Sequence, residues 1–527
     1  MQRRIVLTLI ALAMALPTSN VMAEAPSNAE LHQMILQLRN DLAETKAENK
    51  ALKQLIAPSK TTDALSETTT NQPKVADGAA PQVVKDQPIP LHPKIEKSYL
   101  TLESADGNIK YWVDGRVFLD SGFVDTEKNS FNANTEFRRL RLAIKTKLYK
   151  DWFGEFDTDF APVLGPHKHK TTTKVVTDVS ATDTNKNGTV DAKEVKGTTA
   201  TVNTDTEDAS SGIEIKDLWI AYGGFPNTTI KVGNHKPPFS MAELTTSRWE
   251  TFMETPMVTG TFAPGRRIGL SASNWGNRYS VGTGIFGDEL HLNPTDNGRA
   301  ERMGWAARGV YRPIVEDNAN KIVHLGLNYL LHKPQSDAWD KENQRVEFKY
   351  NVRPEAHFVD YKLLDTGNMR AVDEIPTWGL ELAGKRDRFY AQSEYLQSNV
   401  KRDNDQDPDF SGWYAMAAFF LTNDSRSYSL EDGEFGPVMP NGPLGAFELA
   451  IRYSTLDLND NDAAATRPII GGKAKNTTIG INWYANNNLI LRANYIHANL
   501  DENANGNGDY VGNDDLNIYG MRIEYLF

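Results

Sequence analysis

Apolar and polar residues alternate with a period of two from about residue 99 to the end of the chain. In one such stretch Leu449, Ile451 and Tyr453 alternate with Glu448 and Arg452. This pattern predicts β-strands that each have one apolar face and one charged face. The charged faces carry more charge than a protein core tolerates. The same alternation occurs at 111–120, 139–145, 217–222 and 479–484.

The lengths of the connections between strands favour a membrane barrel over a soluble sandwich. Short connections at 151–152, 225–227, 275–277, 384–388 and 486–488 are interleaved with long polar ones. The long ones run over roughly 161–212, 240–265, 288–300, 334–374, 402–410, 457–475 and 501–516. Short turns at one rim and long loops at the other are typical of outer-membrane barrels. We predict an all-β transmembrane barrel of about 16 antiparallel strands over residues 99–527, with outer-membrane lipid around it.

The first residues predict export from the cytoplasm. Arg3 and Arg4 precede an apolar run from Ile5 to Leu16, and Ala23 precedes Glu24. The run is too short to span a bilayer and suits a signal peptide over residues 1–23. Removing it takes away two arginines and no acid, so the formal charge changes from −12 to −14. Such acidity argues against nucleic acid as a partner.

Heptads follow the signal peptide. Ile35, Leu42, Asn49 and Ile56 fit position a of a coiled coil, with leucines at most d positions. This predicts an α-helical coiled coil over residues 24–57, placed in the periplasm and able to oligomerise. A Pro- and Thr-rich linker is predicted over 58–98. The alternative is a single amphipathic helix packed on its own domain.

Four stretches resemble a known family. They are FRRLRLAIKTKL (137–148), IKDLWIAYGGFPN (215–227), VGNHKPPFSMAELTTSRWETFME (232–254) and FAPGRRIGLS (262–271). Together they are similar to the phosphate-selective porins O and P. The resemblance implies a homotrimer of barrels in the bacterial outer membrane, with the third external loop folded inward as a constriction. In this chain that loop would be about 240–265.

Strand alternation by itself predicts which charges face the lumen. The inward cations are Arg116, Arg139, Arg141, Lys145, Lys147, Arg267, Arg302, Arg308, Arg312, Arg452 and Arg492. Such a ladder passes anions from site to site in a narrow pore, and arginine binds oxyanions with two donors. Acids share this parity, namely Asp114, Asp120, Glu155, Asp157, Asp159, Asp217, Glu381, Glu394 and Glu448. The alternative is therefore that the arginines pair with acids and brace the wall.

The resemblance adds residues of the constriction. Thr246 and Ser247 resemble the hydroxyl pair that binds phosphate, Asp217 resembles an acidic partner of that site, and Arg248 would add charge. Two positions depart from the family pattern: Glu243 replaces an expected lysine, and Thr255 replaces an expected arginine. We expect these departures to weaken selectivity for phosphate and to favour a related oxyanion, a polyphosphate or a small carboxylate.

Residues 183–194 match a calcium loop. The ligands would be Asp183, Asn185, Asn187, the carbonyl of Thr189, Asp191 and Glu194, and Gly188 would make the turn. The residues before it do not predict a helix, so this is not a complete helix–loop–helix motif. We expect a calcium ion in the second external loop, 161–212, where it would order the loop.

These observations predict a porin for passive diffusion of small anionic solutes. Two alternatives stay open: a general or cation-preferring porin, and a barrel that anchors a calcium-dependent surface protein. The chain has no cysteine and no G-x-S-x-G motif. We therefore expect no enzyme.

Overall fold

Strand β27 (Asp515–Leu526) pairs with strand β3 (Ile109–Thr126), and this pairing closes a sheet into a barrel. The computed structural model describes residues 90–96, 99–164, 169–173, 179–181, 195–197, 204–208, 212–287, 289–290, 302–334, 347–403, 406–460 and 468–527. The predicted signal peptide, the predicted coiled coil and residues 183–194 lie outside these ranges. None of the helices in the described part of the chain has the length and apolar character to span a bilayer.

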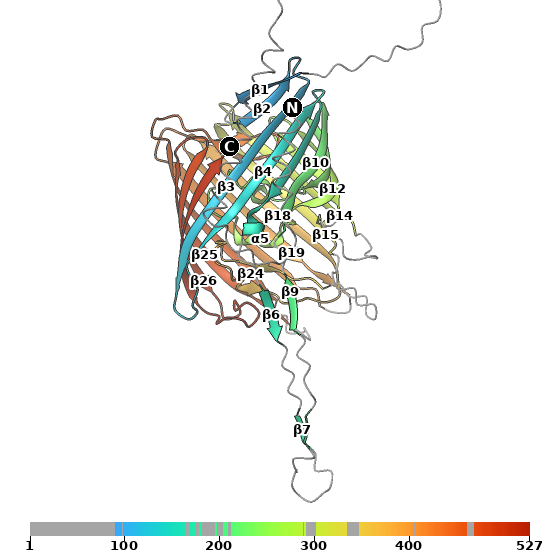
Figure 1. Cartoon of the computed structure of the whole chain (residues 1–527), viewed down its shortest axis with the longest axis vertical. Coiled ribbons are helices and arrows are strands. Elements are labelled where there is room, and N and C mark those ends of the chain that lie inside the picture. Colours follow the sequence, from blue (N-terminus) through green and yellow to red (C-terminus); the bar gives the residue numbers. More distant parts are fainter. Residues whose placement is uncertain are drawn as a thin grey trace, which may run out of the picture. The chain divides into compact units, whose positions relative to one another are not determined.

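The described sheet has 19 strands, and β1, β2 and β20 are short additions to it. The other sixteen form the antiparallel ring, which confirms the predicted number (Figure 1). They are β3 (Ile109–Thr126), β4 (Asn134–Leu148), β5 (Trp152–Asp159), β10 (Glu214–Phe225), β11 (Thr228–His235), β12 (Arg267–Trp275), β13 (Tyr279–Phe286), β14 (Gly304–Glu316), β15 (Lys321–His332), β18 (Val372–Arg386), β19 (Phe389–Asn399), β21 (Asp409–Phe420), β24 (Ala446–Asp460), β25 (Ile469–Tyr484), β26 (Leu489–Leu500) and β27 (Asp515–Leu526).

The barrel is inside-out relative to a soluble protein. On β24 the side chains of Leu449 and Ile451 are 41% and 52% exposed, whereas Glu448 and Arg452 are 0% and 2% exposed. Apolar side chains therefore cover the outer wall and charged ones face the lumen, as in a membrane barrel.

A belt of aromatic side chains crosses adjacent strands of the outer wall. Ring contacts join Trp305 to Tyr329, Trp378 to Tyr395, and Trp413 to Tyr453. The strand register places Tyr329 opposite Trp378 and Tyr395 opposite Trp413, so the belt runs without interruption from β14 to β24. Such girdles lie at the membrane–water interface of transmembrane barrels.

The two ends of the barrel differ in their connections. One end has tight turns, such as 149–151, 226–227 and 387–388, and the other has long loops, such as 236–266 and 333–371. The connection 421–445 breaks the rule, because it is long but lies at the short-turn end. It contains the hairpin β22 (Arg426–Ser429) and β23 (Glu434–Val438), and we call residues 421–445 the inserted hairpin.

Three connections fill part of the lumen. The first is residues 236–266, the constriction loop, with helices α4 (Met241–Leu244) and α5 (Met257–Phe262). The second is 347–371 of a long loop, which contains β16 (Asn351–Val352) and β17 (Leu364–Asp365). The third is the inserted hairpin. Their buried apolar side chains form two clusters with the barrel wall, and Val258 with Phe358 and Met241 with Phe435 are examples.

Smaller elements complete the fold. β1 (Leu91–Glu96) pairs with β2 (Tyr99–Ser104), which pairs with the beginning of β3, so strand structure starts at Leu91 rather than at 99. β20 (Lys401–Arg402) pairs with β18. Between β5 and β10 lie α3 (Ala161–Leu164), β6 (His169–Thr173) paired with β9 (Thr204–Asp208), and β7 (Val179–Ala181) paired with β8 (Val195–Gly197).

Candidate functional site

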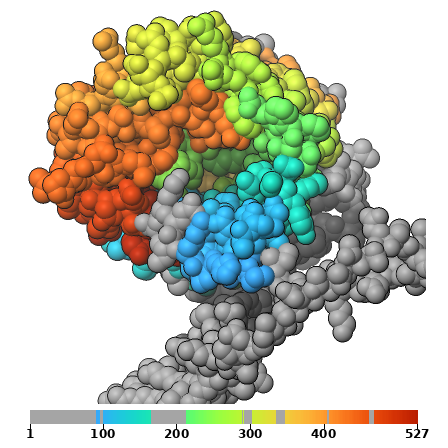
Figure 2. Space-filling view, turned by 90° about the horizontal axis from the view of Figure 1, so that it is seen from above, coloured from blue at the N-terminus to red at the C-terminus, as the bar shows by residue number. Residues whose placement is uncertain are grey.

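The open part of the lumen is an off-centre cavity of about 570 Å³. Its lining comes from β3–β5 and β10–β14, from the constriction loop and from residues 431–434 of the inserted hairpin. The wall strands β18, β19, β21 and β24–β27 do not contribute to it, because the inward-folded connections cover that half of the wall. Figure 2 looks into the barrel from the short-turn end, and the hollow lies beside the cyan and green segments.

The cavity lining carries more basic than acidic side chains. There are eleven lysines and arginines against nine aspartates and glutamates. The basic ones are Arg116, Arg138, Arg139, Arg141, Lys145, Lys216, Lys231, Lys236, Arg248, Arg266 and Arg308; the acidic ones are Glu155, Asp157, Asp217, Glu243, Glu250, Glu254, Glu431, Asp432 and Glu434. The formal excess is two positive charges, so the lining favours anions in a low-dielectric pore.

Arg116 connects the barrel wall to the constriction loop. From β3 its guanidinium donates to Ser247 Oγ at 2.8 Å and to Thr246 Oγ1 at 3.3 Å, and it pairs with Asp157 at 3.2 Å. The next residue of the loop, Arg248, pairs with Asp114 on the same strand. The structure therefore brings together Arg116, Thr246, Ser247 and Arg248, as the sequence predicted.

Three guanidinium groups of the cavity keep donors unused. The Nε atoms of Arg116, Arg139 and Arg248 are buried and have no hydrogen-bond partner within the described residues. Arg139 forms no ion pair with a described residue either. All three guanidinium groups line the cavity, and arginine is suited to oxyanions because it holds them through paired N–H donors.

The other predicted residues of this wall also line the cavity, but each is paired. Arg141 bonds Asp159 at 2.8 Å, and Lys145 lies between Asp114 and Glu155 at 3.0 and 3.3 Å. Asp217 accepts from Arg266 at 2.6 Å. These pairs fix the lining and reduce its net charge.

Arg267 and Arg308 have different places from those of the other predicted residues. Arg267 donates to the carbonyl of Pro264 at 3.0 Å and pairs with Glu289 at 3.3 Å, and it does not line the cavity. Its neighbour Arg266 lines the cavity instead. Arg266 precedes β12, so strand alternation gave no signal for it.

Arg308 lines the cavity and also holds the inserted hairpin. Both arms of its guanidinium bond Glu381 at 2.9 Å, and it donates to the carbonyls of Asp432 and Gly433 at 2.6 and 2.8 Å. Arg308 therefore works as a clamp as well as a lining charge.

The inward arginines of the opposite wall fasten the constriction loop. Arg452 donates to the carbonyl of Glu254 at 2.9 Å, Arg492 to that of Thr251 at 3.3 Å, and Arg522 to that of Met253 at 2.5 Å. Each also pairs with a buried acid, and their partners are Glu355, Glu524 and Asp120. For Arg452 and Arg492 the bracing alternative therefore describes the geometry better than an anion ladder.

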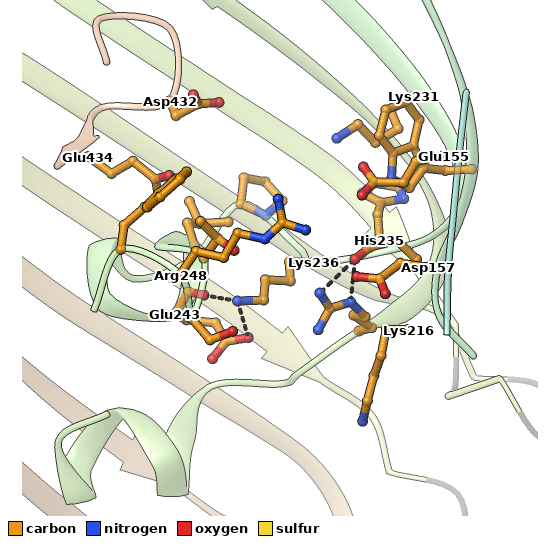
Figure 3. A pocket seen from close by; sticks show the side chains of 18 of the residues that line it. Glu155, Asp157, Lys216, Lys231, His235, Lys236, Glu243, Arg248, Asp432 and Glu434 are labelled. Atoms are coloured by element: carbon orange, nitrogen blue, oxygen red, sulfur yellow. Dashed lines mark hydrogen bonds and ion pairs between the residues drawn. The ribbon is translucent and has the colours of Figure 1, made fainter. Parts of the chain in front are cut away.

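Sequence reasoning missed several lining residues. Lys236 donates to the carbonyl of Glu243 and pairs with its carboxylate at 3.5 Å (Figure 3). The loop therefore carries a cation beside Glu243, the residue that replaces the lysine expected from the family pattern. Lys231 lies over the ring of Trp219 at 4.2 Å, and Lys216 pairs with Glu214. Lys231 lies on the inward face of β11, so strand alternation could have found it. Lys216 has the parity of the outward-facing Leu218 and Ile220. The register of β10 shifts between Ile215 and Asp217, so alternation gave the wrong face for Lys216. Lys236 lies just beyond β11.

The inserted hairpin brings acids to the cavity. Figure 3 shows Asp432 and Glu434 on the side of the cavity away from Lys216 and Lys231. Burial, reinforced by Asp432, raises the pKa of Glu434 to about 8 against the pull of Arg308 and Lys236. No sequence signal marked this segment, because connections at that end are normally short.

The fold and the lining define the class: a sixteen-stranded outer-membrane porin, with long loops outside and short turns in the periplasm. The profile described as Phosphate-selective porin O and P matches residues 191–527. The chain belongs to the phosphate-selective porin O and P family.

Related proteins and structures are as follows. Porin O of Pseudomonas aeruginosa is 30% identical over 339 residues, which cover 58% of this chain and 72% of that protein. An uncharacterized protein of Caulobacter vibrioides is 28% identical over 335 residues, which cover 60% of this chain and 63% of that one. Among solved structures, the anion-selective porin from Comamonas acidovorans is 12% identical, with a TM-score of 0.47, over 80% of this chain and all of that one.

Proposed function

We propose that this porin passes small oxyanions, with phosphate as one of several solutes, through the off-centre cavity by passive diffusion. The supporting observation is the cluster of Arg116, Arg139 and Arg248, whose buried Nε donors have no partner in the described part of the chain. The hydroxyls of Thr246 and Ser247 lie beside this cluster. An anion that leaves its hydration shell exchanges water for these donors. Family membership implies a channel rather than an enzyme.

Reversal potentials in planar bilayers test this proposal. The purified chain would be placed in a KCl gradient, and we expect a potential of the sign set by chloride. Phosphate added to one side should then block part of the chloride current. A potential of the sign set by potassium would contradict anion selectivity.

One observation favours the general or cation-preferring alternative. Carboxylate oxygens of Glu155, Asp157 and Asp217 lie within 4.8 Å of one another in the same cavity. Each acid has a basic partner, namely Lys145, Arg116 and Arg266 respectively. We therefore favour anions. The same KCl gradient separates the two functions.

We also propose that a calcium ion binds residues 183–194. The support is local: β7 and β8 pair with Ala181 opposite Val195, so the strands that flank this twelve-residue stretch are neighbours. Titration calorimetry on the purified protein should show calcium heat that Glu194→Gln removes. Equal heat in both proteins would contradict the assignment.

We further propose a homotrimer, as the family resemblance implies. The mass of the detergent-solubilised protein, measured by analytical ultracentrifugation, should be three times that of one chain. A monomeric mass at concentrations that give channels would contradict it.

A further inference from the structure

Two opposite charges in the cavity lack partners, and they do not pair with each other. Arg139 on β4 and Glu250 on the constriction loop both line the cavity. Neither side chain forms a hydrogen bond or ion pair with a described residue, and each has a buried polar atom without a partner, Nε and Oε2 respectively. Every other acid of the loop that lines the cavity has a basic partner: Glu243 has Lys236, and Glu254 has Arg138.

Arg139 and Glu250 nevertheless act on one another. Burial raises the pKa of the Glu250 carboxyl, and Arg139 is the strongest of the charges that oppose this rise. Both side chains are half-buried and line the same cavity. An unpaired charge in a protein interior is costly unless a ligand or water satisfies it.

The surroundings of each charge differ. Arg139 belongs to the cationic cluster with Arg116 and Arg248, whose Nε atoms are also unused. Beside Glu250 the loop places Thr255, which lines the same two cavities as Glu250 and carries no charge. One side of the site therefore suits an oxyanion, and the other suits a cationic group.

We propose that the cavity binds small zwitterions, with their anionic group at Arg139 and their ammonium group at Glu250. The solute class is amino acids and aminoalkyl phosphonates, which satisfy both unpaired charges at once. A simple oxyanion satisfies only Arg139. This inference rests on the proposed function, because the oxyanion half of the solute uses the same cationic cluster.

A matched pair of probes tests the inference in planar bilayers. 2-Aminoethylphosphonate and ethylphosphonate share the phosphonate and differ by the ammonium group. For each, the concentration that blocks half of the KCl current through the full chain would be measured. We expect the amino compound to block at a concentration at least about tenfold lower, the size of one charge-assisted hydrogen bond. Equal values would overturn the inference.

Two variants and one control assign the preference to Glu250. In Glu250→Gln the half-blocking concentrations of the two probes should become about equal, so that their ratio is about one. Block by ethylphosphonate should be kept or improved. Thr255→Arg should have the same effect, because it places a cation beside Glu250, and it serves where Glu250→Gln does not fold. Glu127→Gln, on the exposed surface, should retain the wild-type ratio. If Glu250 only braces the loop, Glu250→Gln should change the half-blocking concentrations of both probes by the same factor. That result would contradict a ligand role.

The failure of this inference is distinct from that of the proposed function. A wild-type channel that prefers chloride but shows equal block by both probes is an oxyanion porin without a zwitterion site. A channel that prefers potassium would overturn the proposed function itself.

Discussion

Arg116 donates to Ser247 Oγ at 2.8 Å across 131 residues of sequence, and this bond joins the barrel wall to the constriction loop. The same guanidinium pairs with Asp157, and its buried Nε has no partner among the described residues. One residue therefore orients the loop hydroxyls and also adds to the charge that an anion meets.

Ser247→Ala removes the hydroxyl and leaves Arg116 in place. We expect phosphate to block the chloride current less well, by about two- to tenfold, the usual range for one hydrogen bond. The reversal potential in KCl should stay close to that of the wild type, because no charge changes. A large shift of that potential would show that Ser247 holds the loop rather than the solute.

Glu355→Gln should loosen the constriction loop without changing selectivity. Glu355 accepts from the backbone N–H of Met257 at 2.9 Å and from Arg452 at 2.7 Å, and it does not line the cavity. Removing one charge of a buried pair costs about 3–5 kcal/mol, so the unfolding temperature should fall and the single-channel current should become noisier. Glu127→Gln is the matched control. A stable, quiet channel would contradict the anchoring role.

Glu434 predicts a dependence of selectivity on pH. Its pKa is raised to about 8 by burial and Asp432, so it is mostly neutral at pH 6 and ionised at pH 9.5. Arg308 and Lys236 are the cations that face it, and Thr245 is a hydrogen-bond partner. Preference for chloride should therefore fall as the pH rises through about 8. In Glu434→Gln this step should disappear; a step of unchanged size would assign it to another group.

The sequence predicted the barrel well because each strand of such a fold alternates between lipid and lumen. It predicted the roles of the arginines less well, because parity places Arg139 and Arg492 on the same inner face. Their difference arises from the connections that fill half of the lumen: Arg492 meets the constriction loop, and Arg139 meets the cavity. That packing depends on contacts between distant segments.

Residues outside the strands were the hardest to predict. Arg266 was missed beside the predicted Arg267. It precedes β12, so the alternation of inward and outward side chains along a strand does not apply to it. Glu434 lies on a hairpin inserted from the end where turns are normally short. The constriction loop itself was predicted at 240–265 from the resemblance, and the structure places its boundaries at 236 and 266.

The reversal potential of the wild type and of Arg139→Gln in one KCl gradient tests the central claim most directly. The claim is that the cationic cluster of Arg116, Arg139 and Arg248 sets anion preference. We expect the wild type to prefer chloride and Arg139→Gln to shift clearly toward zero potential, because the formal excess of two charges in the lining falls to one. A wild-type preference for potassium, or an unchanged potential in Arg139→Gln, would contradict the claim.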